Sequence, residues 1–320
     1  MPSLQSLPSE LLLLICNFCD QKTLLKLSSI SHRLNFWANR CLFHRIRLRL
    51  GLPERFVGAG QESMVNAIIR GPRLAMHIQR LDVKVMTIWE YIEPWRVEKL
   101  RELLYRLLPV LSNLKSLYLL TPCVPMTGFP WDCENVRRLE ILHLRLPKID
   151  FRELATLILL PNLKALKTFF HCQGSVSSHN DRVPDLRNQC NPSLEKLELM
   201  CHIPERHIEE LLRLTSGLRS LTCFTPRSPA FKTQSPQDGL LPTTPPLSPA
   251  NISECLRPVC HTLRAFQMSD SRVVRWPEHD GTLFDLGTFK SLEILELPDH
   301  FKLRISDYRY SLPRVSVSFT

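Results

Sequence analysis

A repeated pattern of apolar residues constrains the fold of this 320-residue chain more than any other feature. Each copy has an apolar residue, two variable residues, an apolar residue, one variable residue and a third position that is apolar in all copies but one. The steps between successive copies are 36, 25, 24, 31, 24, 45 and 29 residues, mostly near the roughly 20–29 residues of a leucine-rich repeat. The copies begin at Ile78, Leu114, Leu139, Leu163, Leu194, Leu218, Leu263 and Leu292.

Segments with a helical period lie between these copies. Strand and helix therefore alternate along the chain, and successive strands are expected to be parallel. One such unit cannot bury its own apolar face, so the copies predict a stacked array. We predict an α/β fold with an irregular leucine-rich-repeat solenoid over residues 78–320; the alternative is a leucine-rich α/β domain with chance periodicity. The helical segments are 95–111, 151–160 and 204–214, with weaker matches at 251–260 and 283–289.

Residues 225–250 interrupt the repeats. They contain seven prolines and seven serines or threonines, without a helical or strand period. Such a composition predicts an extended, flexible insert. A serine or threonine precedes proline five times, which suggests proline-directed phosphorylation; the alternative is a spacer without a regulatory role. The candidate phosphorylation sites are Thr225, Ser228, Ser235, Thr244 and Ser248.

Residues 7–44 are expected to form a separate unit of three short helices. Asp20 and Ser31 are expected to cap the second and third helices, because their side-chain oxygens can accept hydrogen bonds from the first free amides. The first helix is apolar nearly all round. Leu12 and Leu13 lie opposite the face that carries Leu7, Leu11, Leu14, Ile15 and Phe18. Three short helices cannot bury this much apolar surface, so the first helix is expected to contact the repeats or another protein.

The same segment carries a motif of about 40 residues that resembles an F-box. Together with the repeats, it makes the chain similar to the F-box proteins with leucine-rich-repeat-like domains that are abundant in fungi. The chain departs from this family at Leu34, where many members have tryptophan. The resemblance divides the chain into an F-box domain (1–50), a linker and entry to the repeats (51–77), and the repeats (78–320). The matching residues are Leu7-Pro8-Ser9-Glu10-Leu11, Ile15, Asp20, Thr23, Leu24, Leu27, Ser31 and Arg33.

The resemblance implies a substrate-recognition subunit of a ubiquitin ligase. An F-box docks onto a Skp1-type adaptor, which tethers it to a cullin-RING ligase, while the repeats capture a substrate protein. Such a receptor needs no catalytic group or cofactor, because it acts by holding the substrate near the conjugating enzyme. The alternative role of the adaptor-facing side chains is the small core of the helical unit. The family's adaptor-facing positions correspond here to Leu7, Pro8, Leu11, Ile15, Leu24 and Leu27.

Basic residues favour an acidic partner for the repeats. The formal net charge is +10, and the first 50 residues hold seven basic side chains against two acidic ones. Residues that flank the central apolar position of each copy are expected to face away from the core. They are mainly basic in the early copies, which predicts an acidic or phosphorylated peptide as ligand; an ordinary solvated face is the alternative. The substrate-binding candidates are Arg80, Lys84, Tyr118, His143, Arg145, Lys167 and Lys196.

Three further arginines precede the repeats. Arg45, Arg47 and Arg49 alternate with apolar residues, which predicts a strand with one basic face. This strand is expected to link the helical unit to the first repeat. We interpret its charge as protection of a sheet edge, because charged side chains hinder aggregation through unpaired strands; the alternative is a binding site.

Motifs for catalysis and metal binding are missing from the sequence. It contains no Walker A, Gly-x-Ser-x-Gly or His-Glu-x-x-His motif, so an enzyme is not expected. Cys16 and Cys19 form a Cys-x-x-Cys without a second pair, so neither a metal site nor a cofactor is expected. The eleven cysteines are scattered, and the first apolar run is too short for a signal peptide or a membrane span. These features predict an intracellular protein, cytoplasmic or nuclear, that does not bind membranes.

Two other functions stay open on the sequence alone. An F-box scaffold would bind the adaptor without delivering a substrate to ubiquitin. A basic repeat protein could instead bind nucleic acid, with an affinity that falls steeply as salt rises. The presence of only five tyrosines counts against base stacking.

Overall fold

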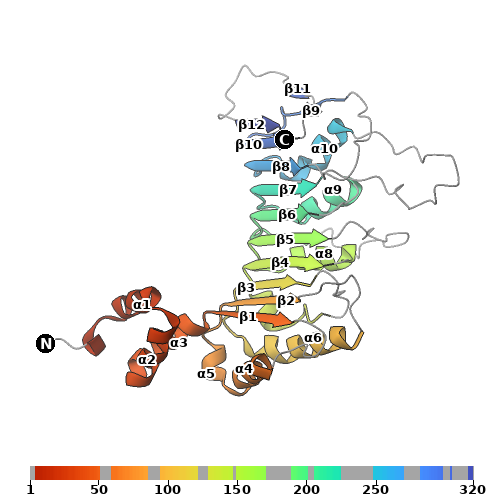
Figure 1. The fold of residues 1–320 in the computed structure, drawn as a ribbon. Coiled ribbons are helices and arrows are strands. Elements are labelled where there is room, and N and C mark those ends of the chain that lie inside the picture. Colours follow the sequence, from red (N-terminus) through yellow and green to blue (C-terminus); the bar gives the residue numbers. More distant parts are fainter. Residues whose placement is uncertain are drawn as a thin grey trace. The chain divides into compact units, whose positions relative to one another are not determined.

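The computed structural model shows a mixed α/β protein (Figure 1). Its chain divides into two compact units. Residues up to Ile141 form the first unit and those from Leu142 on form the second, apart from a short segment at 125–127 that is grouped with the second. The residues that the structure describes are 4–50, 59–85, 94–121, 129–146, 149–170, 189–200, 205–224, 248–269, 282–297, 303–304 and 316–319.

Three helices open the first unit, as predicted. A single turn, η1 (Leu4–Ser6), precedes α1 (Ser9–Phe18), α2 (Gln21–Ile30) and α3 (His32–Phe43). The Asp20 carboxylate accepts a hydrogen bond from the Thr23 amide at 2.8 Å, and the Ser31 hydroxyl accepts one from the Leu34 amide at 3.3 Å. Both predicted helix caps are therefore confirmed. We call α1, α2 and α3 the head.

The head has a small core of its own. Cys16, Leu24 and Ala38 are buried together, one from each helix. Partly buried side chains, Leu27 and Trp37 among them, pack around this cluster. The core is made of small and medium side chains because the three helices are short, and it leaves much of the apolar surface of α1 outside.

The first unit also contains three parallel strands. β1 (Arg45–Leu50) pairs with β2 (Arg80–Val85), and β2 pairs with β3 (Ser116–Leu120). Alternate side chains such as Ile46, Leu48, Leu81 and Val83 are buried, so each strand has one core face and one outer face. The described part of the predicted linker holds two helices, α4 and α5. The helical elements of this unit after the head are α4 (Ala59–Arg70), α5 (Pro72–Ala75), α6 (Pro94–Leu107), η2 (Leu108–Val110) and α7 (Glu134–Arg137).

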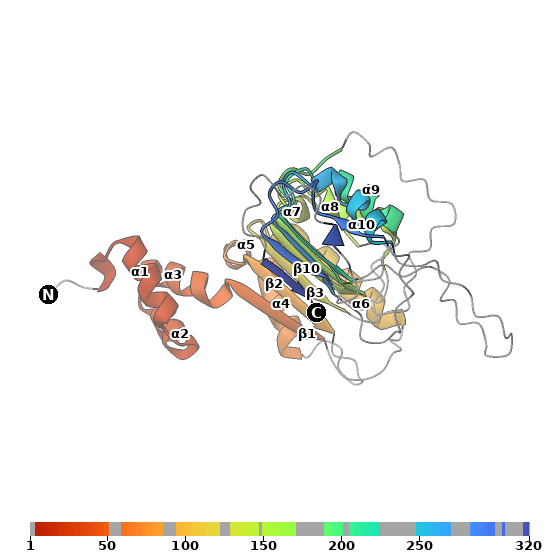
Figure 2. The ribbon, with the colours of Figure 1, turned by 90° about the horizontal axis from the view of Figure 1, so that it is seen from above.

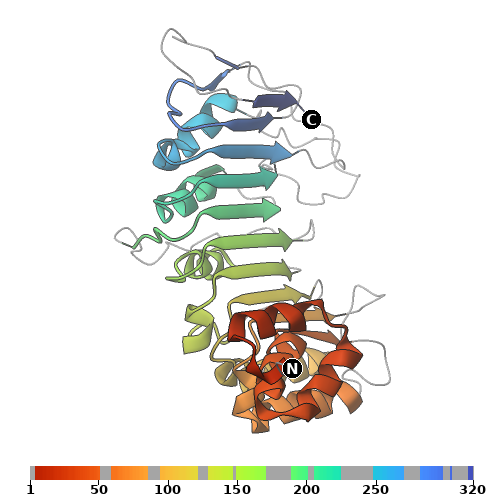
Figure 3. The same ribbon diagram turned by 90° about the vertical axis from the view of Figure 1, so that its left-hand side faces the viewer.

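The second unit continues the alternation of strands and helices. Seven of its strands follow one another in the sheet in chain order, and Figure 3 shows those of the second unit stacked with the same direction. Figure 2 shows α8, α9 and α10 together on one side of these strands. The strands are β4 (Ile141–Leu146), β5 (Ala165–Phe170), β6 (Lys196–Met200), β7 (Ser220–Phe224), β8 (Ala265–Ser269), β10 (Ile294–Leu297) and β12 (Ser316–Phe319). The helical elements are α8 (Phe151–Ile158), α9 (Glu205–Arg213), α10 (Pro249–Cys255) and η3 (Arg257–Val259).

The repeated sequence pattern predicts the strands correctly. In all eight copies, a strand begins two residues after the first apolar position. The central and third apolar positions of the copies are buried, as are the first positions. The predicted alternation of parallel strands with helices is confirmed. The strands of the eight copies are β2, β3, β4, β5, β6, β7, β8 and β10.

One backbone arrangement recurs just before the strands. In the first unit, the carbonyl of His44 accepts hydrogen bonds from the consecutive amides of Gln79 and Arg80, at 3.0 Å each. The carbonyls of Gln79 and Lys115 bind the next pairs of amides in the same way. In the second unit, the carbonyls of Lys164, Glu195, Arg219 and Arg264 repeat the arrangement. Each of these strands therefore starts at a position that is fixed by the strand before it.

Polar side chains reinforce this spacing between neighbouring repeats. The side-chain amide of Asn191 donates to the carbonyls of Ile158 and Leu160, at 2.7 and 2.8 Å. These carbonyls lie at the end of α8, where a helix leaves carbonyls without partners. Similar bonds join Asn113 to the Met76 carbonyl, Asn135 to the Leu108 and Pro109 carbonyls, and Ser291 to the His261 carbonyl.

Two expectations for the later repeats are wrong. Residues 283–289 do not form a helix: β9 (Phe284–Asp285) pairs with β11 (Leu303–Arg304). The Asp285 carboxylate then accepts a hydrogen bond from the Gly287 amide at 2.9 Å, which stabilises a turn instead of a helix. The predicted insert also ends earlier than residue 250, because α10 begins at Pro249.

His77 is a buried histidine in the first unit. Its ring packs edge to face against Phe36 of α3, with the ring centres 5.0 Å apart. Burial lowers the pKa of His77 below its ordinary value, and the positive charge of Arg40 lowers it further. The unfolded chain therefore takes up a proton at His77 more readily than the folded chain does.

We expect the stability of the protein to fall as the pH decreases through about 6.5, the ordinary pKa of histidine. The loss should grow until the pH is below the lowered pKa of His77 and then stay constant. The urea midpoint is measured at about pH 7 and at about pH 5.5. The difference between these two midpoints should be smaller for His77→Gln than for the unchanged protein. His32→Gln, at an exposed position, serves as the control. An equal pH dependence in the protein and His77→Gln would contradict this role.

Candidate functional site

The head exposes a row of apolar side chains on α1. Leu11, Leu14 and Phe18 are 45%, 51% and 84% exposed, and their spacing of three and four residues places them on one side of the helix. Leu12 and Cys16 lie on the opposite side and are buried. The helix thus uses one apolar face for the head core and presents the other. We call Leu11, Leu14 and Phe18 the α1 row.

The predicted adaptor contacts divide into exposed and buried residues. Pro8 and Leu11 are exposed, whereas Leu7 and Ile15 are half-buried. Leu24 belongs to the head core and Leu27 packs against it. Leu24 is therefore a core residue, because its side chain is already covered by the other two helices.

Several exposed apolar residues of the head are not among the predicted adaptor contacts. Leu14 and Phe18 complete the α1 row, and Leu25 and Ile30 of α2 are more than half exposed. Helical spacing already places Leu14 and Phe18 on the same face as Leu11, but the F-box resemblance assigns an adaptor-facing role only to Leu11 in this row. The signal that was available is therefore the shared helix face, which ends in a phenylalanine.

The outer face of the first unit's strands gathers positive charge. The pairing register sets Arg45 beside Arg80, Arg47 beside Asp82, and Arg49 beside Lys84. All six side chains lie on the face opposite the buried Ile46, Leu48, Leu81 and Val83. This face therefore carries five basic groups and one acidic group. We call Arg45, Arg47, Arg49, Arg80 and Lys84 the arginine face.

Asp82 organises three of these arginines. Arg45 forms an ion pair with its carboxylate, with Nε 2.6 Å from Oδ2, and Arg80 donates from Nε to Oδ1 at 2.8 Å. The Nε of Arg47 is 3.7 Å from Oδ2. The guanidinium of Arg80 also lies over the ring of Tyr118, 3.8 Å from its centre. The structure thus brings the predicted residues Arg80, Lys84 and Tyr118 onto one face and adds the three arginines of β1 to them.

The predicted basic residues of the second unit are partly neutralised. Lys167 and Lys196 both form ion pairs with Glu198, which is only 15% exposed. Burial raises the pKa of Glu198, but the hydrogen bonds from the two lysines outweigh this effect and lower it. Arg145 lies over the ring of Phe169, 5.0 Å from its centre, and His143 lies two residues before Arg145 on the same face of β4. Two lysines around one carboxylate leave a smaller excess of charge than the arginine face has.

Ser248 is the one candidate phosphorylation site within the described residues. Its side chain is buried, accepts a hydrogen bond from the Asn251 amide at 3.2 Å and caps α10. A phosphate on Ser248 would have to displace this cap. The other candidates, Thr225, Ser228, Ser235 and Thr244, lie outside the described residues, and for them phosphorylation stays a prediction.

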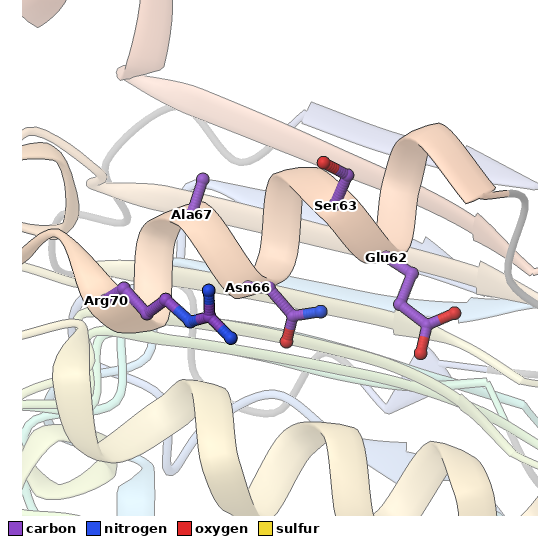
Figure 4. Close-up of a pocket in the computed structure, with 5 residues that line it drawn as sticks. All are labelled: Glu62, Ser63, Asn66, Ala67 and Arg70. Atoms are coloured by element: carbon purple, nitrogen blue, oxygen red, sulfur yellow. The ribbon is translucent and has the colours of Figure 1, made fainter.

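A shallow hollow lies along α4 (Figure 4). It is lined by Glu62, Ser63, Asn66, Ala67 and Arg70, all from this one helix. On the neighbouring side, between α4 and α6, Arg106 donates a hydrogen bond to the Asn66 side chain at 3.1 Å. Ligand pockets usually collect polar groups from several elements, and a hollow lined by one helix does not have this character.

The described residues contain neither a membrane-spanning helix nor a metal-binding cluster. Among them, no helix combines the length and apolar character needed to cross a bilayer. Nor do three histidine, cysteine or acidic side chains of the described segments come together as a metal site. Burial raises the pKa of the Cys223 thiol to about 12, which makes it a packing residue.

Comparison of the chain with models of known protein families finds no match, and comparison with the curated proteins finds none either. The α1 row and the arginine face are therefore the two surfaces that bear on function.

Proposed function

We propose that the protein is the substrate-recognition subunit of a ubiquitin ligase of the Skp1–cullin–F-box type. The head binds a Skp1-type adaptor, and the repeats hold a substrate protein. The chain itself supplies no catalytic group on this proposal, because the adaptor and cullin bring the substrate close to the conjugating enzyme.

The observation that carries the proposal is the α1 row. Isolated apolar side chains on a surface are common, but Phe18 is 84% exposed and shares one helix face with Leu11 and Leu14. A helix that presents such a row is suited to pack against the groove of a partner. This feature agrees with the F-box-like sequence of residues 7–33, in which Leu11 is an adaptor-facing position.

The arrangement of the chain supports the second half of the proposal. Parallel strands alternate with helices in both units, and the outer positions of strands such as β3 and β6 are at least partly exposed. Such a face suits capture of a protein segment, although the same architecture serves many kinds of ligand.

The test is reconstitution with purified proteins. The full chain is mixed with a purified Skp1-type adaptor, and complex formation is followed by size-exclusion chromatography and by titration calorimetry. We expect a stable complex of one chain with one adaptor. Absence of binding at micromolar concentrations would overturn the proposal, because an F-box has to bind its adaptor at the concentrations found in cells.

A second measurement separates a receptor from a scaffold. The half-life of proteins that co-purify with the chain is measured in cells with and without the gene, and with and without proteasome inhibition. A receptor shortens the half-life of its substrate only when the proteasome is active. Adaptor binding without any such effect would instead identify a scaffold.

A further inference from the structure

The arginine face contains two separate centres of positive charge. At the first, Arg45, Arg47 and Arg80 surround the carboxylate of Asp82, so three positive charges meet one negative charge. At the second, Arg49 and Lys84 are paired in the register of β1 and β2. Both side chains are exposed, and within the described residues neither has an ion-pair partner. Each centre therefore carries an excess of two positive charges.

The spacing of the two centres follows from strand geometry. Arg47 and Asp82 lie two residues before Arg49 and Lys84 on their strands, so the centres are about 7 Å apart along the strand direction. The same distance separates side chains two residues apart in an extended peptide, and those side chains point to the same side. An extended ligand can therefore place one anionic side chain over each centre only if the two are two residues apart.

The charge of the first centre identifies the kind of anion. A phosphorylated serine or threonine carries about −1.5 to −2 charges at neutral pH, which matches the excess of two at this centre. Arginine guanidinium groups also bind phosphate oxygens through paired hydrogen bonds. The second centre has no carboxylate between its cations and can accept a glutamate or aspartate side chain.

We infer that the arginine face binds an extended peptide in which a phosphorylated serine or threonine and an acidic residue stand two positions apart. The phosphate contacts Arg45, Arg47 and Arg80, and the acidic side chain contacts Arg49 and Lys84. In the unbound protein the carboxylate of Asp82 neutralises part of this charge, and it competes with the phosphate for the guanidinium groups. The inference rests on the proposed function only in treating this peptide as part of a substrate.

Nucleic acid is a poorer match to this face. Binding of a nucleic acid backbone requires basic groups along a track of several phosphates. The excess charge lies on β1 and β2, whereas the outer positions of β3 are Ser116, Tyr118 and Leu120. The aromatic ring of Tyr118 is covered by Arg80, so a base cannot stack on that side of it.

The test uses the full chain and a fluorescein-labelled synthetic peptide. The peptide has phosphoserine and glutamate two residues apart among alanine and glycine, and binding is followed by fluorescence anisotropy at low salt. Three comparison peptides carry serine in place of phosphoserine, alanine in place of glutamate, or the two anions three residues apart. We expect each of them to bind at least about fivefold more weakly, since each leaves one centre without its anion.

Variants of the chain assign the two centres. Arg45→Gln with Arg47→Gln should weaken binding of the phosphorylated peptide at least about tenfold, because two charged hydrogen-bond donors are lost. Arg49→Gln with Lys84→Gln should abolish the preference for glutamate over alanine and keep the preference for phosphoserine. Asp82→Asn should tighten binding, since it removes the competing carboxylate. The matched control is Arg138→Gln with Arg213→Gln, which removes two exposed charges from helices or their ends and should change affinity less than about twofold.

The outcomes distinguish this inference from the proposed function. Equal affinity for the phosphorylated and unphosphorylated peptides, or equal affinity of the first double variant and the control, would overturn the inference. So would displacement of the peptide by single-stranded DNA at lower concentrations than by unlabelled peptide. Adaptor binding is measured on the same variants and should not change. If the peptide does not bind, the inference fails, and the adaptor measurement still tests the proposed function.

Discussion

Replacement of both Leu11 and Phe18 by aspartate is expected to weaken binding of the Skp1-type adaptor by more than about a hundredfold. Burial of a large apolar side chain contributes about 1.5–3 kcal/mol, and each 1.4 kcal/mol corresponds to about tenfold in affinity. Both residues lie in the α1 row and are exposed in the chain alone. The substitutions also introduce two charges that the interface would have to desolvate.

The folded state should survive these two substitutions. The head core is formed from the other side of α1, where Cys16 meets Leu24 and Ala38. Circular dichroism and the thermal midpoint should therefore stay close to those of the unchanged protein. The matched control is Met76→Asp with Leu283→Asp, which makes the same change at exposed apolar residues outside the head. Adaptor binding that is equal in the variant and the control would show that the α1 row is not the docking surface.

The substitution Asn191→Leu is expected to lower the free energy of unfolding by about 3 kcal/mol. Asn191 is buried, and its side-chain amide binds two helix-end carbonyls, those of Ile158 and Leu160. Its side-chain oxygen also accepts a hydrogen bond from the Ser193 amide at 2.9 Å. Leucine has a similar size but leaves these groups without partners, at a cost of about 1–3 kcal/mol for each buried group.

Urea unfolding measures this effect, and the chain offers its own control. Asn113 makes the same kind of bond, from its side-chain amide to the Met76 carbonyl at 2.7 Å, but it is exposed. Water can replace that bond, so Asn113→Leu should cost less than about 1 kcal/mol. Similar losses for the two variants would mean that burial of the carbonyls is not the source of the stability.

Periodicity was sufficient to predict the strands. The central and third apolar positions of each copy are two residues apart, and a strand with one buried face explains such a spacing next to helical segments. The prediction succeeded even at Leu163–Thr168, where a threonine takes the third position, because Thr168 is buried with its hydroxyl 3.3 Å from the Glu198 carbonyl.

Interactions between distant residues were beyond this kind of reasoning. The alternation of Arg45, Arg47 and Arg49 predicts a strand with a basic face, but it does not reveal that Asp82 lies among these arginines. That fact depends on the parallel register of β1 and β2, which are separated by about thirty residues of chain. The same holds for α1, where packing of Cys16 against α3 decides which apolar face is covered. The local sequence pattern determines neither the register of β1 and β2 nor the face of α1 that is covered.

The hydrogen bonds at the starts of the strands determine where the chain can accept inserted residues. The paired amides at Gln79 and Arg80, and their counterparts in later repeats, permit no extra residue at the start of a strand. The long steps of the pattern are accommodated after strands, as between β7 and α10. Insertions acquired during evolution, or epitopes grafted in the laboratory, should therefore be tolerated after the ends of the strands and disrupt the fold at their starts.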